Sequence, residues 1–266
     1  MVPEKIIIYH EHSMHTVDTI MATSMNLRVH IAPVGFEIDR IVIPAKKRKA
    51  DKVWLLVHEN KSDDKALPFI EKIQKQLKKA NIDVEMEDHN RRDLFKIIKS
   101  VKNIIQKEKG NSIYVNLASG SKIQAIGCMM ACMMFNDEKT VHPFYAEAKE
   151  YLGFKGQISS GIKEINNIPP YEIQIPDRKH IQALQLIKEK GGRLTKKEMA
   201  ILADDKGIIT VNAEKDNYTQ ARFASLDKNI IQPLQEKWKF IKVEKSGRTR
   251  FIEITEEGKN AAEFLI

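Results

Sequence analysis

The sequence has 266 residues, of which 42% are hydrophobic, so the chain can form a packed core and wholesale disorder is excluded. Its 44 basic and 36 acidic residues give a formal net charge of +8, which permits a polyanionic partner without requiring one. The longest apolar run, at residues 125–135, is shorter than the roughly 18 residues of a membrane span, and the N-terminus lacks the pattern of a secretory signal. We therefore expect a cytoplasmic protein with no membrane partner.

Cys128 and Cys132 lie inside this apolar run at helical spacing, which is typical of buried packing thiols in a reduced compartment. Residues 1–24 are polar and rich in histidine, and we treat them as an N-terminal extension. These histidines form no carboxylate–histidine pair on a helical pattern, so the sequence predicts neither a metal site nor a required cofactor.

Up to about residue 150, short apolar runs of the strand type alternate with longer amphipathic segments. The runs predict strands at residues 27–31, 52–58, 83–86, 112–117 and 142–146. Apolar stripes predict helices at residues 64–79 and 94–105. Alternation at this spacing favours an α/β Rossmann-like domain with a mainly parallel sheet, in which ligands bind beyond the carboxyl ends of the strands.

Three prolines interrupt both periodicities between residues 166 and 176. The sequence therefore predicts the N-terminal extension at 1–24, a Rossmann-like domain at 25–165, a linker at 166–177 and a second domain at 178–266. In the second domain we expect helices at 180–189, 195–202 and 218–235, followed by strands at 240–245 and 249–254. This order is that of a winged helix-turn-helix. We expect Pro233 to kink or end its helix, and residues 204–215 to be an insertion.

The strongest local signal is residues 116–122 (NLASGSK), between the fourth predicted strand and a helix. Small residues let a backbone approach a ligand closely, and hydroxyls, amides and a lysine at a helix N-terminus attract phosphate. An ordinary strand–helix turn that is rich in small residues remains the alternative. The candidate ligand-binding residues in this segment are Asn116, Ser119, Gly120, Ser121 and Lys122.

Other polar or glycine-containing turns follow the first three predicted strands and should reach the same edge of the sheet. Each alone is typical of a solvated loop, whereas several at equivalent strand ends indicate a site. These turns add Pro33, Gly35, Phe36, His58, Asn60 and Arg91 to the candidate ligand-binding residues.

The strand–APVGFE–helix and strand–NLASGSK–helix segments, followed by a winged helix, resemble the CARF domain (CRISPR-associated Rossmann fold) of archaeal CARF–winged-helix transcription regulators. The resemblance covers residues 25–266. It implies a homodimer that binds a cyclic oligoadenylate, or a related nucleotide, across the dimer axis. By position it implies that Gly35 and Phe36 line the pocket and that residues 119–122 cradle ribose and phosphate.

Between Lys215 and Arg250 there are nine basic and four acidic residues, which favours contact with double-stranded DNA. The start of the third helix carries side chains that can read base edges, and the wing carries cations that can contact phosphate. The candidate DNA-binding residues are Asn217, Tyr218, Thr219, Gln220, Arg222, Lys245, Arg248 and Arg250. A winged helix used only for protein contacts remains an alternative.

Two other function classes also remain open. One is a metal-independent ring nuclease that cleaves cyclic oligoadenylate in the same pocket, with Ser119, Ser121 and Lys122 positioning the phosphate and His58 or His89 as base. The other is an interaction module without a ligand. Our leading hypothesis is a ligand-sensing, DNA-binding transcription regulator rather than an enzyme.

Overall fold

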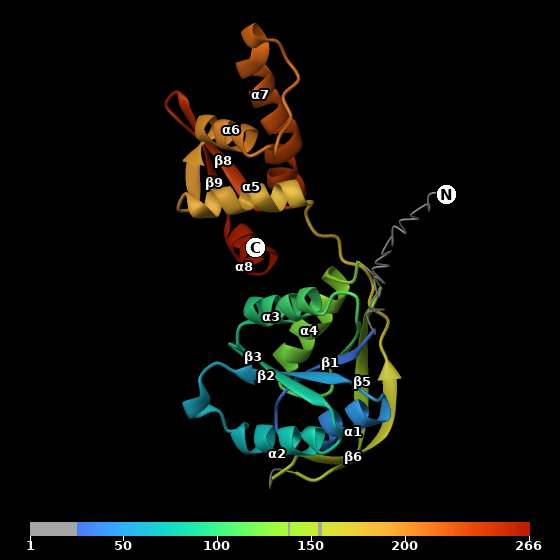
Figure 1. The fold of residues 1–266 in the computed structure, drawn as a ribbon. Coiled ribbons are helices and arrows are strands. Elements are labelled where there is room, and N and C mark those ends of the chain that lie inside the picture. The colour runs from blue at the N-terminus through green and yellow to red at the C-terminus, as the bar shows by residue number, and fades with distance from the viewer. Residues whose placement is uncertain (1–25, 138, 154–155) are drawn as a thin grey trace, which may run out of the picture.

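The structure is a computed structural model that describes residues 26–137, 139–153 and 156–266. It contains a six-stranded α/β domain and a smaller domain with a three-stranded sheet (Figure 1). The N-terminal extension at 1–24 and its histidines lie outside the described residues. No helix in the described part is long and apolar enough to cross a membrane.

The large sheet has the strand order β3-β2-β1-β4-β5-β6, and only β6 runs antiparallel to its neighbour. The strands are β1 (Arg28–Pro33), β2 (Lys52–His58), β3 (Asp83–His89), β4 (Ser112–Asn116), β5 (Val141–Tyr151) and β6 (Ser159–Asn167). The order reverses direction between β1 and β4, which makes the loops after these two strands the topological switch point. The prediction of a Rossmann-like, mainly parallel sheet is confirmed.

Helices cover both faces of this sheet. They are α1 (Asp39–Lys47), α2 (Leu67–Lys78), α3 (Leu94–Lys107) and α4 (Lys122–Met134). Leu55 of β2 belongs to the core that α1 and α2 cover, whereas its neighbour Leu56 belongs to the core under α3 and α4. Cys128 and Cys132 of α4 are fully buried free thiols in this second core, as the sequence predicts. A strand covered on both faces has no polar side to interrupt its apolar run, which is why β2 has the predicted limits.

Several strand limits differ from the predictions. Residues Ala32 and Pro33, expected in a loop, extend β1, and β3 and β5 are longer than expected. The strand β6 was not predicted, and its burial is intermediate or exposed along most of its length. An edge strand needs no continuous apolar run, so its sequence resembles a loop.

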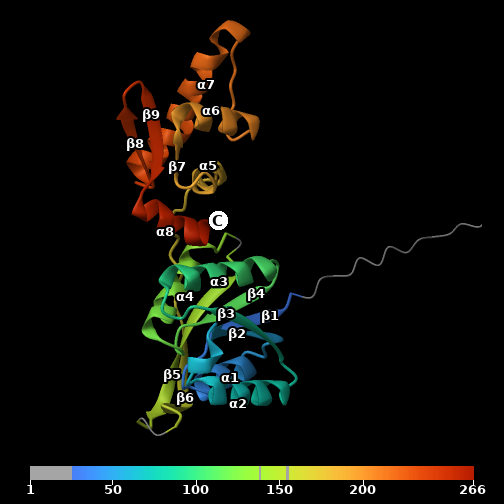
Figure 2. The same cartoon turned by 90° about the vertical axis from the view of Figure 1, so that its left-hand side faces the viewer.

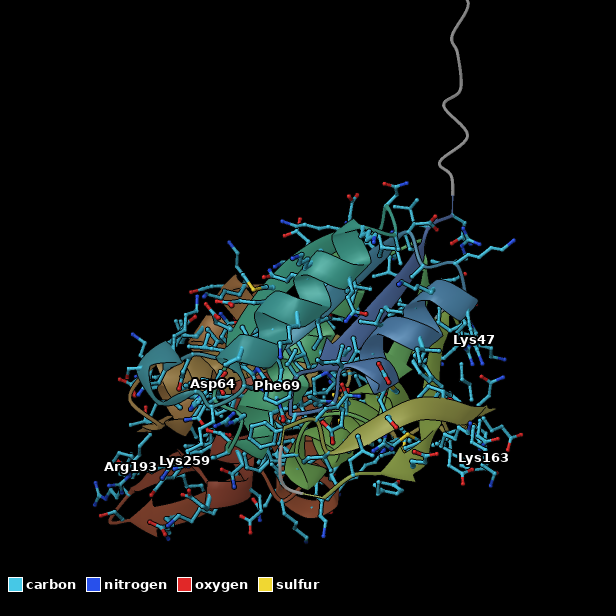
Figure 3. All side chains as sticks on the ribbon, turned by 90° about the horizontal axis from the view of Figure 1, so that it is seen from below. Lys47, Asp64, Phe69, Lys163, Arg193 and Lys259 are labelled. Carbon is cyan, nitrogen blue, oxygen red and sulfur yellow. The ribbon has the colours of Figure 1, made fainter. Side chains whose placement is uncertain are left out.

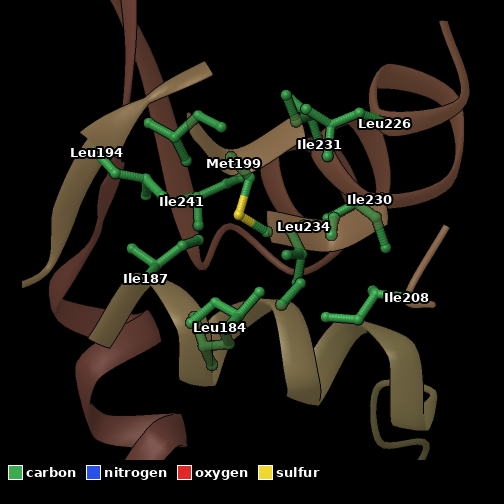
Figure 4. Close-up of a cluster of buried hydrophobic side chains, with 14 of the residues drawn as sticks. Leu184, Ile187, Leu194, Met199, Ile208, Leu226, Ile230, Ile231, Leu234 and Ile241 are labelled. Atoms are coloured by element: carbon green, nitrogen blue, oxygen red, sulfur yellow. The ribbon is translucent and has the colours of Figure 1, made fainter. Parts of the chain in front are cut away.

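The second domain has the winged-helix order, with the sheet order β7-β9-β8. Its elements are α5 (Arg178–Glu189), β7 (Arg193–Thr195), α6 (Lys196–Asp205), α7 (Tyr218–Leu226), β8 (Ile241–Ser246), β9 (Thr249–Ile254) and α8 (Glu256–Leu265). A capping box begins α6, since Thr195 accepts from the Glu198 amide and Glu198 accepts from the Thr195 amide. Figure 4 shows the core, where Leu184 of α5, Met199 of α6 and Leu234 pack together.

The helical segment that begins with α7 does not end at Pro233. It continues in two π-helical turns, Asp227–Ile231 and Pro233–Lys237. Proline lacks the amide that in a regular turn would donate to the Asn229 oxygen, and this oxygen instead lies 2.9 Å from Nε2 of His180. The second of the wider turns closes with the Trp238 N–H donating to the Pro233 oxygen at 3.1 Å. The supposed insertion at 204–215 is partly absorbed by the end of α6, and Ile208 and Ile209 from it are buried in the core.

The C-terminal helix α8, which the sequence analysis did not predict, lies between the winged domain and α3 in both views (Figures 1 and 2). Ala261, Phe264 and Leu265 belong to the same buried cluster as the inner face of α3. A side chain at Gly258 would place its Cβ 2.1 Å from the Phe240 oxygen, so only glycine lets α8 lie this close to the start of the wing. The two domains are therefore joined by packing as well as by the linker.

Candidate ligand site and nucleic-acid interface

The loops after β1 and β4 touch through two glycines. A Cβ on Gly35 would lie 3.1 Å from the Gly120 Cα, and a Cβ on Gly120 would lie 2.6 Å from the Pro33 Cβ. Gly120 also has a φ of 76°, in the left-handed region that favours glycine. The small residues of both motifs are thus required for the close approach of the two loops at the switch point.

Beside this contact lies a cavity of about 190 Å³. It is lined by Val34, Gly35, Phe36, Glu37, Ala66, Arg91, Gly120, Ser121, Gln124 and Ile158. The cavity brings together five of the candidate ligand-binding residues, which are Gly35, Phe36, Arg91, Gly120 and Ser121. Ligand pockets usually measure roughly 300–1,000 Å³, so this cavity is large enough for only part of a ligand.

The N-terminus of α4 is tightly organised at the cavity. Ser121 forms a capping box with Gln124, and its amide and hydroxyl donate to the Gln124 Oε1 at 2.9 and 3.0 Å. The Gln124 amide nitrogen in turn lies 3.0 Å from Nε2 of His89. Since the amide must donate there, the proton of a neutral His89 is assigned to Nδ1. Ser121 is therefore occupied as a cap, while Lys122 beside it is exposed.

Asn116 holds the loop rather than facing the cavity. Its side-chain amide donates to the Arg40 oxygen at 2.8 Å, its carbonyl accepts from the Ala118 amide at 2.8 Å, and the residue is 1% exposed. Ser119 is equally buried, and its hydroxyl has no hydrogen-bond partner among the described residues. Both residues are therefore buried beneath the Gly120 turn, and the hydrogen bonds of Asn116 hold this turn in place.

Figure 3 labels Asp64 and Phe69, each of which contacts a residue that lines the cavity. The Phe36 ring packs edge-on against Phe69, with centroids 5.4 Å apart. Arg91 forms an ion pair of 2.8 Å with the buried carboxylate of Asp64. These contacts fix one aromatic and one cationic wall of the cavity.

Two candidate residues lie away from the cavity. His58 lines a neighbouring hollow of about 150 Å³ that also includes Met86, and Asn60 caps a short turn by accepting from the Ser62 amide and hydroxyl. An equivalent position at a strand end is therefore not enough to reach the cavity, since Arg91 after β3 lines it and His58 after β2 does not. The other suggested base, His89, is 3% exposed, and burial lowers its pKa.

Glu37 lines the cavity and was not among the candidates. It is 8% exposed, and burial raises the pKa of its carboxyl group. The charge of Arg40 and the backbone amides of Glu37, Gly120 and Phe36 oppose this rise in pKa. The signal that could have found it is an acidic residue between Phe36 and Ile38, in a loop that is otherwise apolar.

In the winged domain, the candidates on the third helix divide into two groups. Asn217, Thr219 and Gln220 are exposed. Tyr218 and Arg222 instead turn back toward Asp204 of α6. The Tyr218 hydroxyl lies 3.1 and 3.0 Å from the two carboxylate oxygens of Asp204, and the Arg222 Nε lies 2.8 Å from one of them. The expected base-reading role of Arg222 thus competes with an internal ion pair.

The wing carries three exposed cations at its tip. Lys245 and Arg250 are direct cross-strand partners, and Arg248 lies in the turn beside Gly247. None of the three has an acidic partner in the described part of the chain, whereas Lys242, lower in the wing, pairs with Glu244 at 2.8 Å. Like charges placed opposite each other destabilise a hairpin, and a bound polyanion would relieve the repulsion.

Comparisons with known proteins match the two domains separately. Residues 28–151 match the family model "HFX_2341_N:-like, N-terminal", and residues 179–266 match the DUF6293 C-terminal winged helix domain. Uncharacterized protein MJ1513 of Methanocaldococcus jannaschii is 30% identical over 204 residues. This alignment covers 66% of the present chain and 61% of that relative's length, which is less than two thirds.

Solved structures with a similar fold are distant. Can2 from Sulfobacillus thermosulfidooxidans, in complex with cyclic tetra-adenylate, is 10% identical with a TM-score of 0.39, covering 89% of this chain and 63% of that one. Enterococcus italicus Csm6, bound to cyclic hexa-2'-fluoro-hexa-dAMP, is 10% identical with a TM-score of 0.38, covering 79% and 56%. The two matches, an HFX_2341-like N-terminal region followed by a DUF6293 winged helix domain, occur in the order that the resemblance to CARF–winged-helix proteins predicts.

Proposed function

We propose that this protein is a DNA-binding transcription regulator controlled by a nucleotide ligand. The observation that carries the proposal is the wing, where Lys245 and Arg250 face each other and Arg248 adds a third cation without an acidic partner in the described residues. Such a cluster favours contact with the phosphate backbone. The exposed Asn217, Thr219 and Gln220 at the start of the third helix would then read base edges.

The ligand half of the proposal rests on the loops after β1 and β4. Gly35 and Gly120 bring two backbones together at the switch point, and Lys122 places a positive charge at the N-terminus of α4. The resemblance of these loops to CARF motifs supports a cyclic oligoadenylate as the ligand. Since the cavity holds only part of a ligand, we propose a homodimer in which two such sites share one cyclic molecule.

A packed route joins the proposed ligand site to the wing. The helix α4 begins at the ligand loop, and its Gly127 lies so close to α3 that an added Cβ would be 2.7 Å from Ile97. The helix α3 also packs against α8, which follows β9 of the wing directly. In this proposal residues 25–165 sense the ligand, residues 178–266 bind DNA, and 166–177 link them. A ligand that favours one arrangement of α4 would thereby bias the position of the wing.

DNA binding is tested by fluorescence anisotropy with duplex DNA at several salt concentrations. The Lys245→Ala/Arg250→Ala variant should bind more weakly, and the slope of log affinity against log salt should become shallower by about 2, or about 0.9 for each lost phosphate contact. The matched control, Lys149→Ala/Lys163→Ala, removes two exposed lysines from the β5 and β6 strands and should leave the slope unchanged. Wild-type protein without salt-sensitive DNA affinity would refute the regulator half.

Ligand binding is tested by thermal unfolding with cyclic tetra- and hexa-adenylate. A ligand at about 100 times its Kd should add about 2.7 kcal/mol to the free energy of unfolding, and Lys122→Ala should weaken this effect. The control variant Lys96→Ala removes an exposed lysine on α3. Absence of any shift would refute the sensor half, and cleavage products recovered after incubation would favour a ring nuclease instead.

A further inference from the structure

Glu37 carries a buried carboxylate inside the ligand cavity. The residue is 8% exposed and lines the cavity with Gly35 and Gly120. Its Oε2 would lie 2.7 Å from a Cβ on Gly35, and this oxygen has no hydrogen-bond partner among the described residues. Burying an acceptor in this state costs free energy, which the packing of the loop alone does not recover.

The nearest cation does not account for the position of this carboxylate. Arg40 lies one helical turn further on. Its Nε donates to the Ala146 oxygen at 2.9 Å and its guanidinium lies 5.0 Å from the centre of the Tyr145 ring, while one terminal nitrogen is buried without a hydrogen-bond partner among the described residues. No ion pair within 4.0 Å joins Glu37 to a basic residue in the described ranges. Arg91, on the same cavity, is committed to Asp64. Glu37 is therefore not part of a structural salt bridge.

A carboxylate inside the cavity determines which part of a nucleotide can enter. It would repel a phosphate placed beside it, but it accepts strong hydrogen bonds from neutral donors. The phosphate is better placed outside, toward the exposed Lys122, while the Phe36 ring offers an apolar wall to a base or a sugar. The cavity thus suits the portion of a nucleotide that carries N–H or O–H donors.

We propose that Glu37 is the specificity-determining residue of the ligand cavity, and that it selects nucleotides by accepting a hydrogen bond from a neutral donor, either a ribose hydroxyl or the exocyclic amine of a base. This inference rests on the proposed nucleotide-sensing function. The other polar side chains that line the cavity are engaged, Gln124 and Ser121 with each other and Arg91 with Asp64. Glu37 is the cavity residue whose acceptor stays available for the ligand.

The test measures the binding of three ligands to the full-length protein by isothermal titration calorimetry. The ligands are cyclic tetra-adenylate, its inosine counterpart, which lacks the exocyclic amine, and its 2'-deoxy counterpart, which lacks the ribose hydroxyl. The variants are Glu37→Gln, which keeps the size of the side chain, and Glu37→Asp, which shortens it. Glu59→Gln, an exposed acid after β2, is the matched control. The melting temperature of each unliganded variant shows that it is folded.

Wild-type protein and the Glu59→Gln control should prefer cyclic tetra-adenylate over one of the two analogues by about tenfold or more, as expected for a hydrogen bond to a charged group. The analogue that binds weakly identifies the donor. In Glu37→Gln and Glu37→Asp this preference should fall to less than about threefold. A preference that survives in both variants overturns the inference but leaves the nucleotide sensor intact. Equal wild-type affinity for all three ligands also overturns it, as does a uniform gain in affinity in Glu37→Gln. Wild-type protein that binds none of them overturns both proposals.

Discussion

The ammonium group of Lys102 donates a hydrogen bond of 3.0 Å to the backbone oxygen of Phe264. Lys102 lies on α3 of the sheet domain and Phe264 lies in the last turn of α8, so this bond crosses from one domain to the other. The same ammonium group also donates to the Leu265 oxygen at 2.9 Å. The last carbonyls of a helix lack partners within the helix, and a cation there also complements the helix dipole.

Replacement of this lysine should loosen the contact between the domains. We expect Lys102→Met, which keeps an apolar stem, to lower the free energy of unfolding by about 1–3 kcal/mol, because two charge-assisted hydrogen bonds are lost. Lys96→Met, an exposed lysine on the same helix, should change it by less than about 0.5 kcal/mol. Urea unfolding measures both variants, and equal stability would show that α8 docks through its apolar residues alone.

Alanine variants of Gly120 and Gly110 distinguish the cost of backbone strain from the cost of steric crowding. Both have positive φ angles, of 76° and 87°, but an added Cβ meets Pro33 and Gln124 at Gly120 and nothing within 4 Å at Gly110. We expect both alanine variants to lose about 1 kcal/mol of stability from the backbone conformation. Gly120→Ala should lose about 1–3 kcal/mol more because the loops must move apart. Chemical denaturation of both variants tests this, and equal losses would contradict the close contact of the loops.

His30 should make the protein sensitive to acid. It is 2% exposed beside the rings of Tyr114 and Phe144, and burial, with a smaller contribution from Arg48, lowers its pKa to about 3. The unfolded chain therefore binds a proton below about pH 6.5, whereas the folded chain binds it only near pH 3. Within this window each unit of falling pH should remove about 1.4 kcal/mol of stability through His30.

Denaturation at a series of pH values measures this contribution. In His30→Phe, which keeps an aromatic ring at this position, the slope of stability against pH should be shallower by one proton between about pH 4 and 6. His142→Phe is the control, because its ring is exposed and the corresponding change should be smaller. An unchanged slope in His30→Phe would show that the buried imidazole is protonated in the folded protein.

Asp204 should restrain the recognition helix. Its carboxylate lies 2.8 Å from the Arg222 Nε and accepts from Tyr218, which raises the pKa of the Tyr218 hydroxyl. In Asp204→Asn the pKa of Tyr218 should fall toward its ordinary value in an ultraviolet titration. Arg222 would become free for the DNA, so affinity should rise several-fold and the salt slope should steepen by about 0.9. Weaker binding would instead show that Asp204 aims Arg222 at the DNA.

The elements that could be predicted from the sequence are those whose own residues determine their burial. The strand β2 is apolar on both faces and the third helix begins with the expected residue, whereas β6 and α8 depend on neighbours that are distant in sequence. The polar residues of β6 are tolerated because it lies at the edge of the sheet. Gly258 of α8 is unfavourable by helix propensity, but a larger residue there would collide with the Phe240 oxygen.

The candidate site could be predicted where backbone geometry determines it but not where long-range contacts do. Gly35 and Gly120 meet because they follow the two strands at the switch point. His58 and Arg91 also follow parallel strands, but Arg91 lines the cavity while His58 lines another hollow. Glu37 was overlooked because nothing in the spacing of the loop reveals that its carboxylate turns inward.

The buried thiols of α4 can report how often this helix separates from the sheet. Burial raises the pKa of Cys128 to about 12 and that of Cys132 well above its ordinary value, so the folded helix holds almost no reactive thiolate at neutral pH. An alkylating reagent can therefore modify them only when α4 separates from the sheet. The rate of thiol modification therefore measures how often α4, which begins at the loop after β4, opens in the unmutated protein.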